Sequence, residues 1–260
     1  QMNLAASKID IGLLTAEFIE GNESDEIKFL NEKLSHIVNV DTSSKKAKDV
    51  ILFGFGRIGR LTARELIKQA GKGQQLRLKA IVVRNLTKEQ IIKRADLFRT
   101  DSVHGVFKGV VSLELESNSI IVNGQVIQFI EGKNPENINY EQYGINDALL
   151  IDNTGAYTDK ESLSIHLKSV GVSKVLLTAP GKGIPNIVYG INSKNLDIDN
   201  NNIFSAASCT TNCIAPILRV IEDKFNINKG HLETVHAYTN DQNLLDNMHK
   251  KTRRGRSAAI

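Results

Sequence analysis

The chain has 260 residues, of which 41% are hydrophobic and 24% are charged, which excludes a chain that is disordered throughout. Its formal net charge is only +4, which argues against a dedicated nucleic-acid-binding protein, and no apolar run approaches the roughly 18 residues of a membrane span. Two cysteines are too few for a disulfide scaffold, so we expect a reducing, cytoplasmic compartment.

Residues 1–48 are predicted to form a helical extension followed by a linker. Apolar residues recur there at helical spacing, in the order Ile11, Leu14, Phe18, Ile27, Leu30, Leu34 and Ile37. The small and charged residues of 41–48 then break the pattern, as a linker does.

From Val50 the pattern changes to strands that alternate with helices. Residues 50–53 predict a buried strand, 54–59 a glycine turn, 60–69 a helix and 76–83 a second strand, which together form a βαβ unit. A hairpin is predicted across Asn123-Gly124, further strands at 148–152 and 174–178, and a helix at 159–170. The chain is therefore predicted to be an α/β protein with a Rossmann-type, doubly wound sheet.

The glycine turn has the spacing of a dinucleotide-binding loop. Gly54 permits a tight turn, Gly56 lets the backbone approach a pyrophosphate, and Gly59 lets helix and strand pack closely. Arg57 and Ile58 complete the turn and are expected to contact the cofactor, and the N–H groups at the start of the following helix would face the pyrophosphate. The alternative is a tight strand–helix turn that binds no ligand.

The acidic residue that would bind the ribose hydroxyls of NAD is absent after the second strand, and Arg84 stands in its place. A guanidinium there could pair with the 2′-phosphate of NADP, so we favour NADP or dual use of NAD and NADP. The alternative is that Arg84 points into solvent and other contacts hold NAD.

The two cysteines, Cys209 and Cys213, lie just before a helix predicted at 215–225. A helix N-terminus favours the reactive thiolate form of a cysteine, although a cysteine in this position is more often inert. Cys213 is expected to be a small buried residue. The sequence offers no further ligands at zinc spacing, so no metal site is predicted.

Residues 50–260 resemble the phosphorylating glyceraldehyde-3-phosphate dehydrogenase family. The resemblance rests on the glycine turn, on a cysteine block followed 27 residues later by a histidine block, and on three shorter motifs. These are Gly54–Arg60, Ser208–Cys213, Thr234–Gln242, Asp101–Gly105, Asn153–Gly155 and Thr178–Pro180.

The resemblance implies that Cys209 is the nucleophile and that His236, expected on a strand at 231–237, is its acid–base partner. It implies a reaction in which glyceraldehyde 3-phosphate and inorganic phosphate give 1,3-bisphosphoglycerate through a Cys thioester, in glycolysis or gluconeogenesis. Family positions that contact phosphate or align the site correspond to Ser208, Thr210, Thr239 and Arg256. Residues of the dinucleotide groove correspond to Thr154, Gly155 and Thr178.

The resemblance also implies domain boundaries: an NAD(P)-binding domain over residues 49–207 and the incomplete start of an α+β catalytic domain over 208–260. We expect the chain to be a C-terminally truncated fragment, unstable or inactive alone, of a full-length homotetramer. The sequence departs from the family pattern at Phe53, where Asn is usual, and in the N-terminal extension.

Three alternatives remain open. Erythrose-4-phosphate dehydrogenase and semialdehyde dehydrogenases share the Cys–His chemistry, although the 234–239 block argues against the second. A non-catalytic module that binds nucleotides or RNA could use the basic cluster at 250–256, but no aromatic residues for base stacking interleave with it.

Overall fold

The computed structural model describes residues 9–22, 24–38, 47–70, 76–194, 196–239, 242–249 and 252–258. The chain divides into two compact units, Gln1–Asn212 and Cys213–Ile260, which are described separately below. No described helix is long and apolar enough to cross a membrane.

The N-terminal extension is helical, as predicted. It contains α1 (Ile11–Glu20) and α2 (Glu26–Lys33), which begin at Asp10 and Asp25 because each aspartate accepts a hydrogen bond from the backbone N–H three residues on. The rings of Phe18 and Phe29 meet edge to face at 5.3 Å. The expected apolar side is only partly formed, because Ile11 and Ile27 are exposed. Of the predicted linker, residues 41–46 lie outside the described residues.

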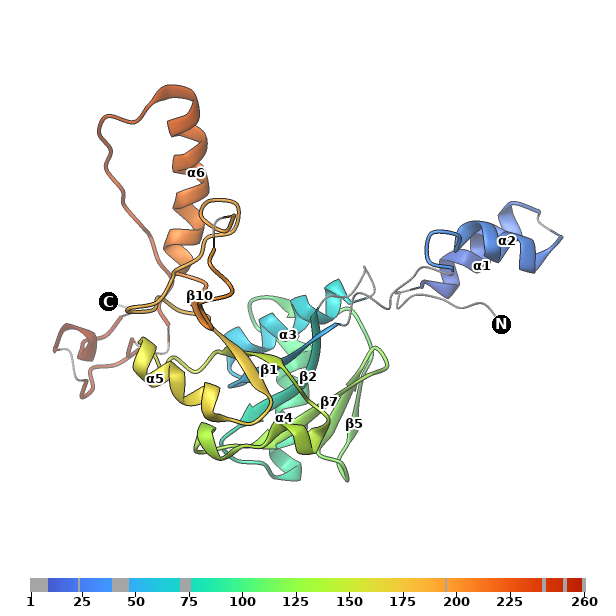
Figure 1. The fold of residues 1–260 in the computed structure, drawn as a ribbon, viewed down its shortest axis with the longest axis horizontal. Helices are drawn as coiled ribbons and strands as arrows, with labels where there is room; N and C mark the ends of the chain where they lie inside the picture. The colour runs from blue at the N-terminus through green and yellow to red at the C-terminus, as the bar shows by residue number, and fades with distance from the viewer. Residues whose placement is uncertain are drawn as a thin grey trace. The chain divides into compact units, whose positions relative to one another are not determined.

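An eight-stranded sheet forms the centre of the first unit (Figure 1), in the order β10-β9-β8-β1-β2-β7-β6-β5. Adjacent strands from β10 to β7 are parallel, whereas β5, β6 and β7 pair antiparallel. The strands are β1 (Lys48–Phe53), β2 (Leu76–Val83), β5 (Val111–Glu114), β6 (Ser119–Val122), β7 (Gln125–Glu131), β8 (Ala148–Asp152), β9 (Val172–Leu177) and β10 (Ile203–Ser205). A separate two-stranded sheet joins β3 (Thr100–Asp101) to β4 (Gly105–Val106).

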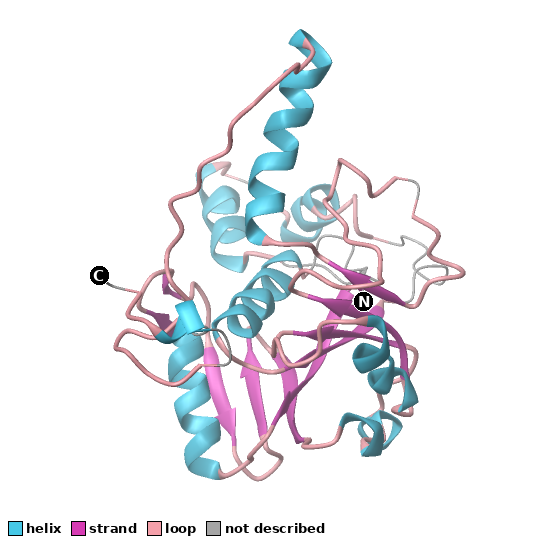
Figure 2. Cartoon of the chain, turned by 90° about the vertical axis from the view of Figure 1, so that its left-hand side faces the viewer, coloured by secondary structure: helices cyan, strands magenta, loops and turns pink. Residues whose placement is uncertain are grey.

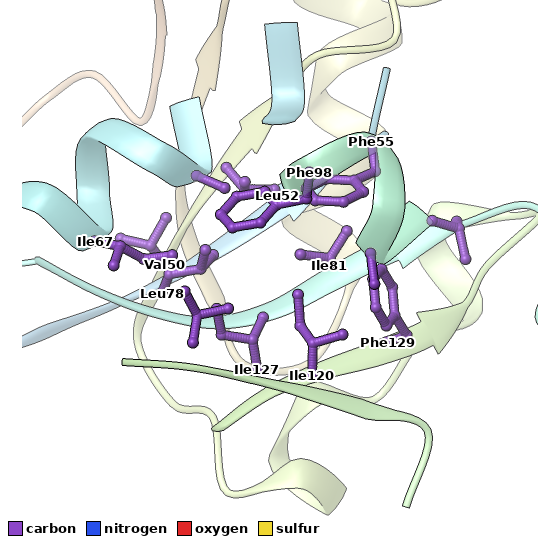
Figure 3. Close-up of a cluster of buried hydrophobic side chains, with 14 of the residues drawn as sticks. Val50, Leu52, Phe55, Ile67, Leu78, Ile81, Phe98, Ile120, Ile127 and Phe129 are labelled. Atoms are coloured by element: carbon purple, nitrogen blue, oxygen red, sulfur yellow. The ribbon is translucent and has the colours of Figure 1, made fainter. Parts of the chain in front are cut away.

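Helices cover both faces of the sheet (Figure 2), so it is doubly wound as predicted. On one face, α3 (Arg57–Gln69) and α4 (Lys88–Arg99) pack on a core that Figure 3 shows, where the ring of Phe55 contacts those of Phe98 and Phe129 toward one end of the cluster. On the other face, Leu163 of α5 (Lys160–Ser164) packs on a second core. The short 3₁₀ segments are η1 (Pro135–Asn137), η2 (Tyr140–Tyr143), η3 (Ile165–Lys168) and η4 (Thr252–Gly255).

The predicted strands of the first unit are confirmed to within two or three residues. The strand at 50–53 is buried on both faces, which is why its sequence is a continuous apolar run. The hairpin turn forms at Asn123-Gly124, where both residues have positive φ, of 50° and 81°. The helix predicted at 159–170 is interrupted: α5 ends at Ser164 and the chain continues as η3.

Two expectations for the C-terminal part were wrong. Helix α6 (Cys209–Phe225) begins at Cys209, and Cys213 is exposed, because α6 has no buried residue. No strand forms at 231–237, where all residues are exposed. A strand needs a hydrogen-bonded neighbour, and no described residue of the second unit provides one.

Candidate functional site

A cleft of about 370 Å³ opens at the carboxyl ends of four parallel strands, β1, β2, β7 and β8. The chain runs outward from β1 to β2 in one direction and from β8 to β10 in the other. The cleft therefore lies at the point where the strand order reverses, which is where open α/β sheets bind ligands. Its volume is in the range of small-molecule sites.

The three predicted loop glycines have distinct physical roles. Gly54 lines the cleft with φ of +94°, and a Cβ on it would meet the Thr154 methyl at 2.8 Å. A Cβ on Gly59 would meet the Gly54 carbonyl oxygen at 2.4 Å, so only glycine allows this approach of helix to loop. Gly56 also lines the cleft, and a Cβ on it would stand in open space with no protein atom within 4 Å.

The N-terminus of α3 is available to an anion. Gly56 is its N-cap and provides no side-chain cap, while Arg57 and Ile58 form an exposed first turn. The Arg57 guanidinium lies 3.6 Å from Asp101, a carboxylate that is 5% exposed. Hydrogen bonds from the backbone of His104 and Val103, then from the His104 ring, hold the pKa of Asp101 well below its usual value.

Three cationic side chains line the cleft: the predicted Arg84, together with Arg94 of α4 and Lys133. Among the described residues, no acidic side chain lines the cleft and none of the three cations forms an ion pair. Partial burial lowers the pKa of Arg94, whose guanidinium donates a hydrogen bond to Gln90 Oε1 at 2.9 Å. The cleft is therefore an electropositive site suited to an anion.

On the opposite wall of the cleft, a turn after β8 carries Thr154 and Gly155. Thr154 lines the cleft, and Gly155 has φ of +68° but is not part of the lining. Thr178 follows β9, and both its N–H and its hydroxyl donate to the backbone carbonyl of Asp152 at 3.0 Å. The unusual Phe53 lines the cleft and packs against Tyr157 and His166.

The nucleophile predicted from the sequence, Cys209, is exposed at the first position of α6. The helix begins there because the Ser208 hydroxyl accepts from the backbone N–H of Thr211 at 2.9 Å. Ala207, just before, has a positive φ of 58°, an unfavourable conformation for a residue with a Cβ. Thr210 is half-buried in the first turn. The helix N-terminus favours a thiolate at Cys209.

The second unit carries His236, Thr239 and Arg256. The His236 ring is exposed, and its Nδ1 donates to the Ala237 carbonyl oxygen at 2.5 Å, because a carbonyl oxygen can only accept. Arg256 is exposed and pairs with Asp246 at 2.9 Å. The Thr239 N–H donates to the Gln242 side chain.

The structure thus brings Gly54, Gly56, Arg84 and Thr154 together at one cleft, with Arg57, Ile58 and Gly59 in the adjoining turn of α3. Sequence analysis missed Arg94 and Lys133. Lys133 directly follows Gly132 at the carboxyl end of β7, so its place after a predicted strand could have indicated it. Arg94 lies in mid-helix, where no sequence signal indicates it. Among the described residues, no group of three His, Cys, Asp or Glu side chains is placed to hold a metal ion.

Two family models match the chain. The model described as "Glyceraldehyde 3-phosphate dehydrogenase, NAD binding domain" matches residues 48–160, and the model of the C-terminal domain of the same enzyme matches residues 208–260. The first of these supports a nicotinamide cofactor in the cleft, which the glycine loop and the open N-terminus of α3 fit.

Relatives with this family name cover different shares of the chain. A glyceraldehyde-3-phosphate dehydrogenase-like protein of Pseudomonas aeruginosa is 49% identical over 100% of this chain, the helical extension included, and 57% of its own length. The glyceraldehyde-3-phosphate dehydrogenase of Zymomonas mobilis is 39% identical over 82% of this chain and 60% of its own length. The chloroplastic enzyme A of Zea mays is 41% identical over 81% and 50%. The chain thus spans between half and three-fifths of these relatives, and it belongs to the glyceraldehyde-3-phosphate dehydrogenase family.

Proposed function

We propose that the full-length protein is a phosphorylating glyceraldehyde-3-phosphate dehydrogenase that works in glycolysis or gluconeogenesis. The observation that carries this proposal is an exposed Cys209 at the first position of a 17-residue helix, in a chain that also holds a dinucleotide cleft. The helix N-terminus supports the thiolate that such a reaction needs.

In the proposed reaction, the Cys209 thiolate adds to the aldehyde carbon, and the new oxyanion takes a hydrogen bond from the protein. His236 accepts the thiol proton as the thiolate forms, donates it to the new oxyanion to give a hemithioacetal, and accepts the hydroxyl proton as the hydride leaves. Bound NAD(P) supplies the acceptor for the hydride. Inorganic phosphate then attacks the resulting thioester, which releases 1,3-bisphosphoglycerate and restores the thiolate. Ser208, Thr210, Thr239 and Arg256 are proposed to bind the phosphate groups or align the site.

We also propose that the cleft accepts NADP at least as well as NAD. Arg84, Arg94 and Lys133 face one cleft with no lining acid, so a ligand with an extra phosphate would neutralise more of their charge. The missing ribose acid removes the group that would repel a 2′-phosphate.

The test is an assay of the full-length protein with glyceraldehyde 3-phosphate and phosphate, followed at 340 nm with NAD and NADP side by side. We expect phosphate-dependent turnover that Cys209→Ser lowers by at least about 10³-fold, because a hydroxyl is not ionised at neutral pH. The matched control Cys213→Ser should keep it. Turnover only with the four-carbon aldehyde would favour erythrose-4-phosphate dehydrogenase, and ligand binding without turnover would favour a nucleotide-binding module.

The cofactor proposal has its own test. Arg84→Gln should lower kcat/KM with NADP by about tenfold or more while changing that with NAD by less than about twofold, because a charge-assisted hydrogen bond to phosphate is lost. Arg77→Gln is the control, since Arg77 lies at the other end of β2 and pairs with Asp49 at 3.1 Å. Equal losses with both cofactors would contradict the assignment of Arg84 to the 2′-phosphate.

A cytoplasmic location and a homotetramer are proposed for the full-length protein on its family membership. Light scattering of the purified full-length protein would test the tetramer, and a stable monomer with full activity would contradict it.

A further inference from the structure

A buried polar pair lies directly behind the cofactor cleft. His166 and Asp152 are both 0% exposed, and the His166 Nε2 lies 2.9 Å from Asp152 Oδ2. The rings of Phe53 and Tyr157, which line the cleft, pack edge-on against the imidazole at 4.7 Å and 5.0 Å. The Nδ1 atom of His166 is buried and has no hydrogen-bond partner among the described residues.

Stability alone does not explain this pair. Replacing both partners of a buried hydrogen bond by apolar groups of the same shape is nearly neutral or stabilising, and a buried nitrogen without a partner is unfavourable. The role of the pair therefore lies in the other hydrogen bonds that Asp152 makes.

The second oxygen of Asp152 holds the turn that lines the cleft. Its Oδ1 accepts hydrogen bonds from both the N–H and the hydroxyl of Thr154, each at 2.7 Å. The Thr154 hydroxyl in turn accepts from the Ala156 N–H at 3.1 Å. The Asp152 backbone carbonyl also accepts twice from Thr178. One buried residue thus ties together the two threonines assigned to the cofactor groove.

Thr154 transmits this arrangement to the glycine loop. The space beside Gly54 is closed by the Thr154 methyl, which lies 2.8 Å from where a Cβ would stand. Gly54 carries the positive φ that turns the chain from β1 toward α3. Hydrogen bonds therefore connect His166 through Asp152 to Thr154, and the Thr154 methyl stands beside Gly54 in the loop that meets the cofactor.

We propose that His166 and Asp152 are positioning residues for the cofactor: His166 fixes the carboxylate of Asp152, which fixes Thr154 against Gly54 and so sets the shape of the glycine loop. This inference rests on the proposed cofactor cleft but not on the dehydrogenase reaction. It predicts that the pair controls binding of the adenosine–pyrophosphate half of NAD and NADP alike.

The test is calorimetric titration of the full-length protein with ADP-ribose, which carries that half and no nicotinamide. Asp152→Asn, His166→Gln and Thr154→Val should each raise Kd by about tenfold, because a loop displaced by a fraction of an ångström loses its aligned contacts. The double variant Asp152→Asn/Thr154→Val should bind no more weakly than either single variant, since both act through one contact. The rate of Cys209 alkylation by iodoacetamide should stay unchanged.

Ser169→Ala is the matched control. Ser169 is 2% exposed, and its hydroxyl donates to the Pro135 carbonyl at 2.7 Å, away from the cleft. It should weaken folding without changing Kd. Thr154 is exposed, so Thr154→Val tests the inference even if the buried variants fail to fold.

Wild-type Kd in folded Asp152→Asn or Thr154→Val, or additive losses in the double variant, would overturn the inference. If the wild type binds ADP-ribose but shows no turnover, the proposed reaction fails while the positioning role stands on its own outcome.

Discussion

Residues 48–207 and residues 213–258 show two different relations between sequence pattern and structure. In the first stretch, apolar runs pair as strands and are covered on both faces, so residues such as Val50, Leu52 and Leu150 are fully buried. In the second, α6 has a helical apolar pattern, yet Ile217, Val220 and Phe225 are exposed.

The difference shows that a helix can form without a surface that covers it, whereas a strand needs a hydrogen-bonded neighbour. Helix α6 forms because its backbone hydrogen bonds lie within the segment and Ser208 caps it. The segment 231–237 has strand-forming residues as well, but its hydrogen bonds must come from a neighbour. Among the described residues of the second unit, no such neighbour exists.

Removal of core volume should affect the two regions most differently. Leu150→Ala should lower the free energy of unfolding by about 2–5 kcal/mol, because it leaves a cavity in the second core. Val220→Ala, at a side chain that is 64% exposed, should change it by less than about 0.5 kcal/mol. Both are measured by denaturant unfolding of the 260-residue chain. Equal losses would show that α6 is packed in solution.

Two substitutions in the glycine loop should have smaller effects, one on the stability of the fold and the other on ligand binding. Gly59→Ala should destabilise the fold by about 1–3 kcal/mol, because its Cβ would overlap the Gly54 carbonyl. Gly56→Ala should cost under about 1 kcal/mol but weaken ADP-ribose binding, because Gly56 lines the cleft. Thermal unfolding and calorimetry measure the two effects. Full binding by a folded Gly56→Ala variant would contradict the role given to Gly56.

The smallest change is expected in the stability of the fold at acid pH. The folded state holds the pKa of Asp101 below its ordinary value of 3.8, so the unfolded chain binds the proton more readily as the pH falls below about 4. The stabilisation is therefore present above that pH and is lost as the pH decreases. Asp101→Asn should make the free energy of unfolding depend less steeply on pH in this range. Urea unfolding between about pH 5 and about pH 2.5, which spans the ordinary pKa of an aspartate, measures this slope. An unchanged slope would remove Asp101 as its source.

Much of the cofactor side could be predicted from the sequence because its signals are local. Gly54, Gly56 and Gly59 act through backbone geometry within six residues, and Arg84 directly follows an apolar strand that the sequence indicates clearly. Arg94 and His166 could not be predicted, because their roles depend on which strand ends and helices meet in space. The prediction that His236 lies on a strand was wrong for a related reason. The residues of a segment do not determine whether another strand is present to pair with it.

The most direct test of the central claim is detection of the covalent intermediate. Full-length protein is mixed with glyceraldehyde 3-phosphate and NADP without inorganic phosphate, quenched, digested and examined by mass spectrometry. We expect one equivalent of reduced cofactor per active site and an acyl group on the peptide at Cys209. The Cys213→Ser variant should still carry this acyl group, whereas the Cys209→Ser variant should not. An unmodified Cys209 after a full burst, or an acyl group that persists in Cys209→Ser, would contradict the thioester mechanism.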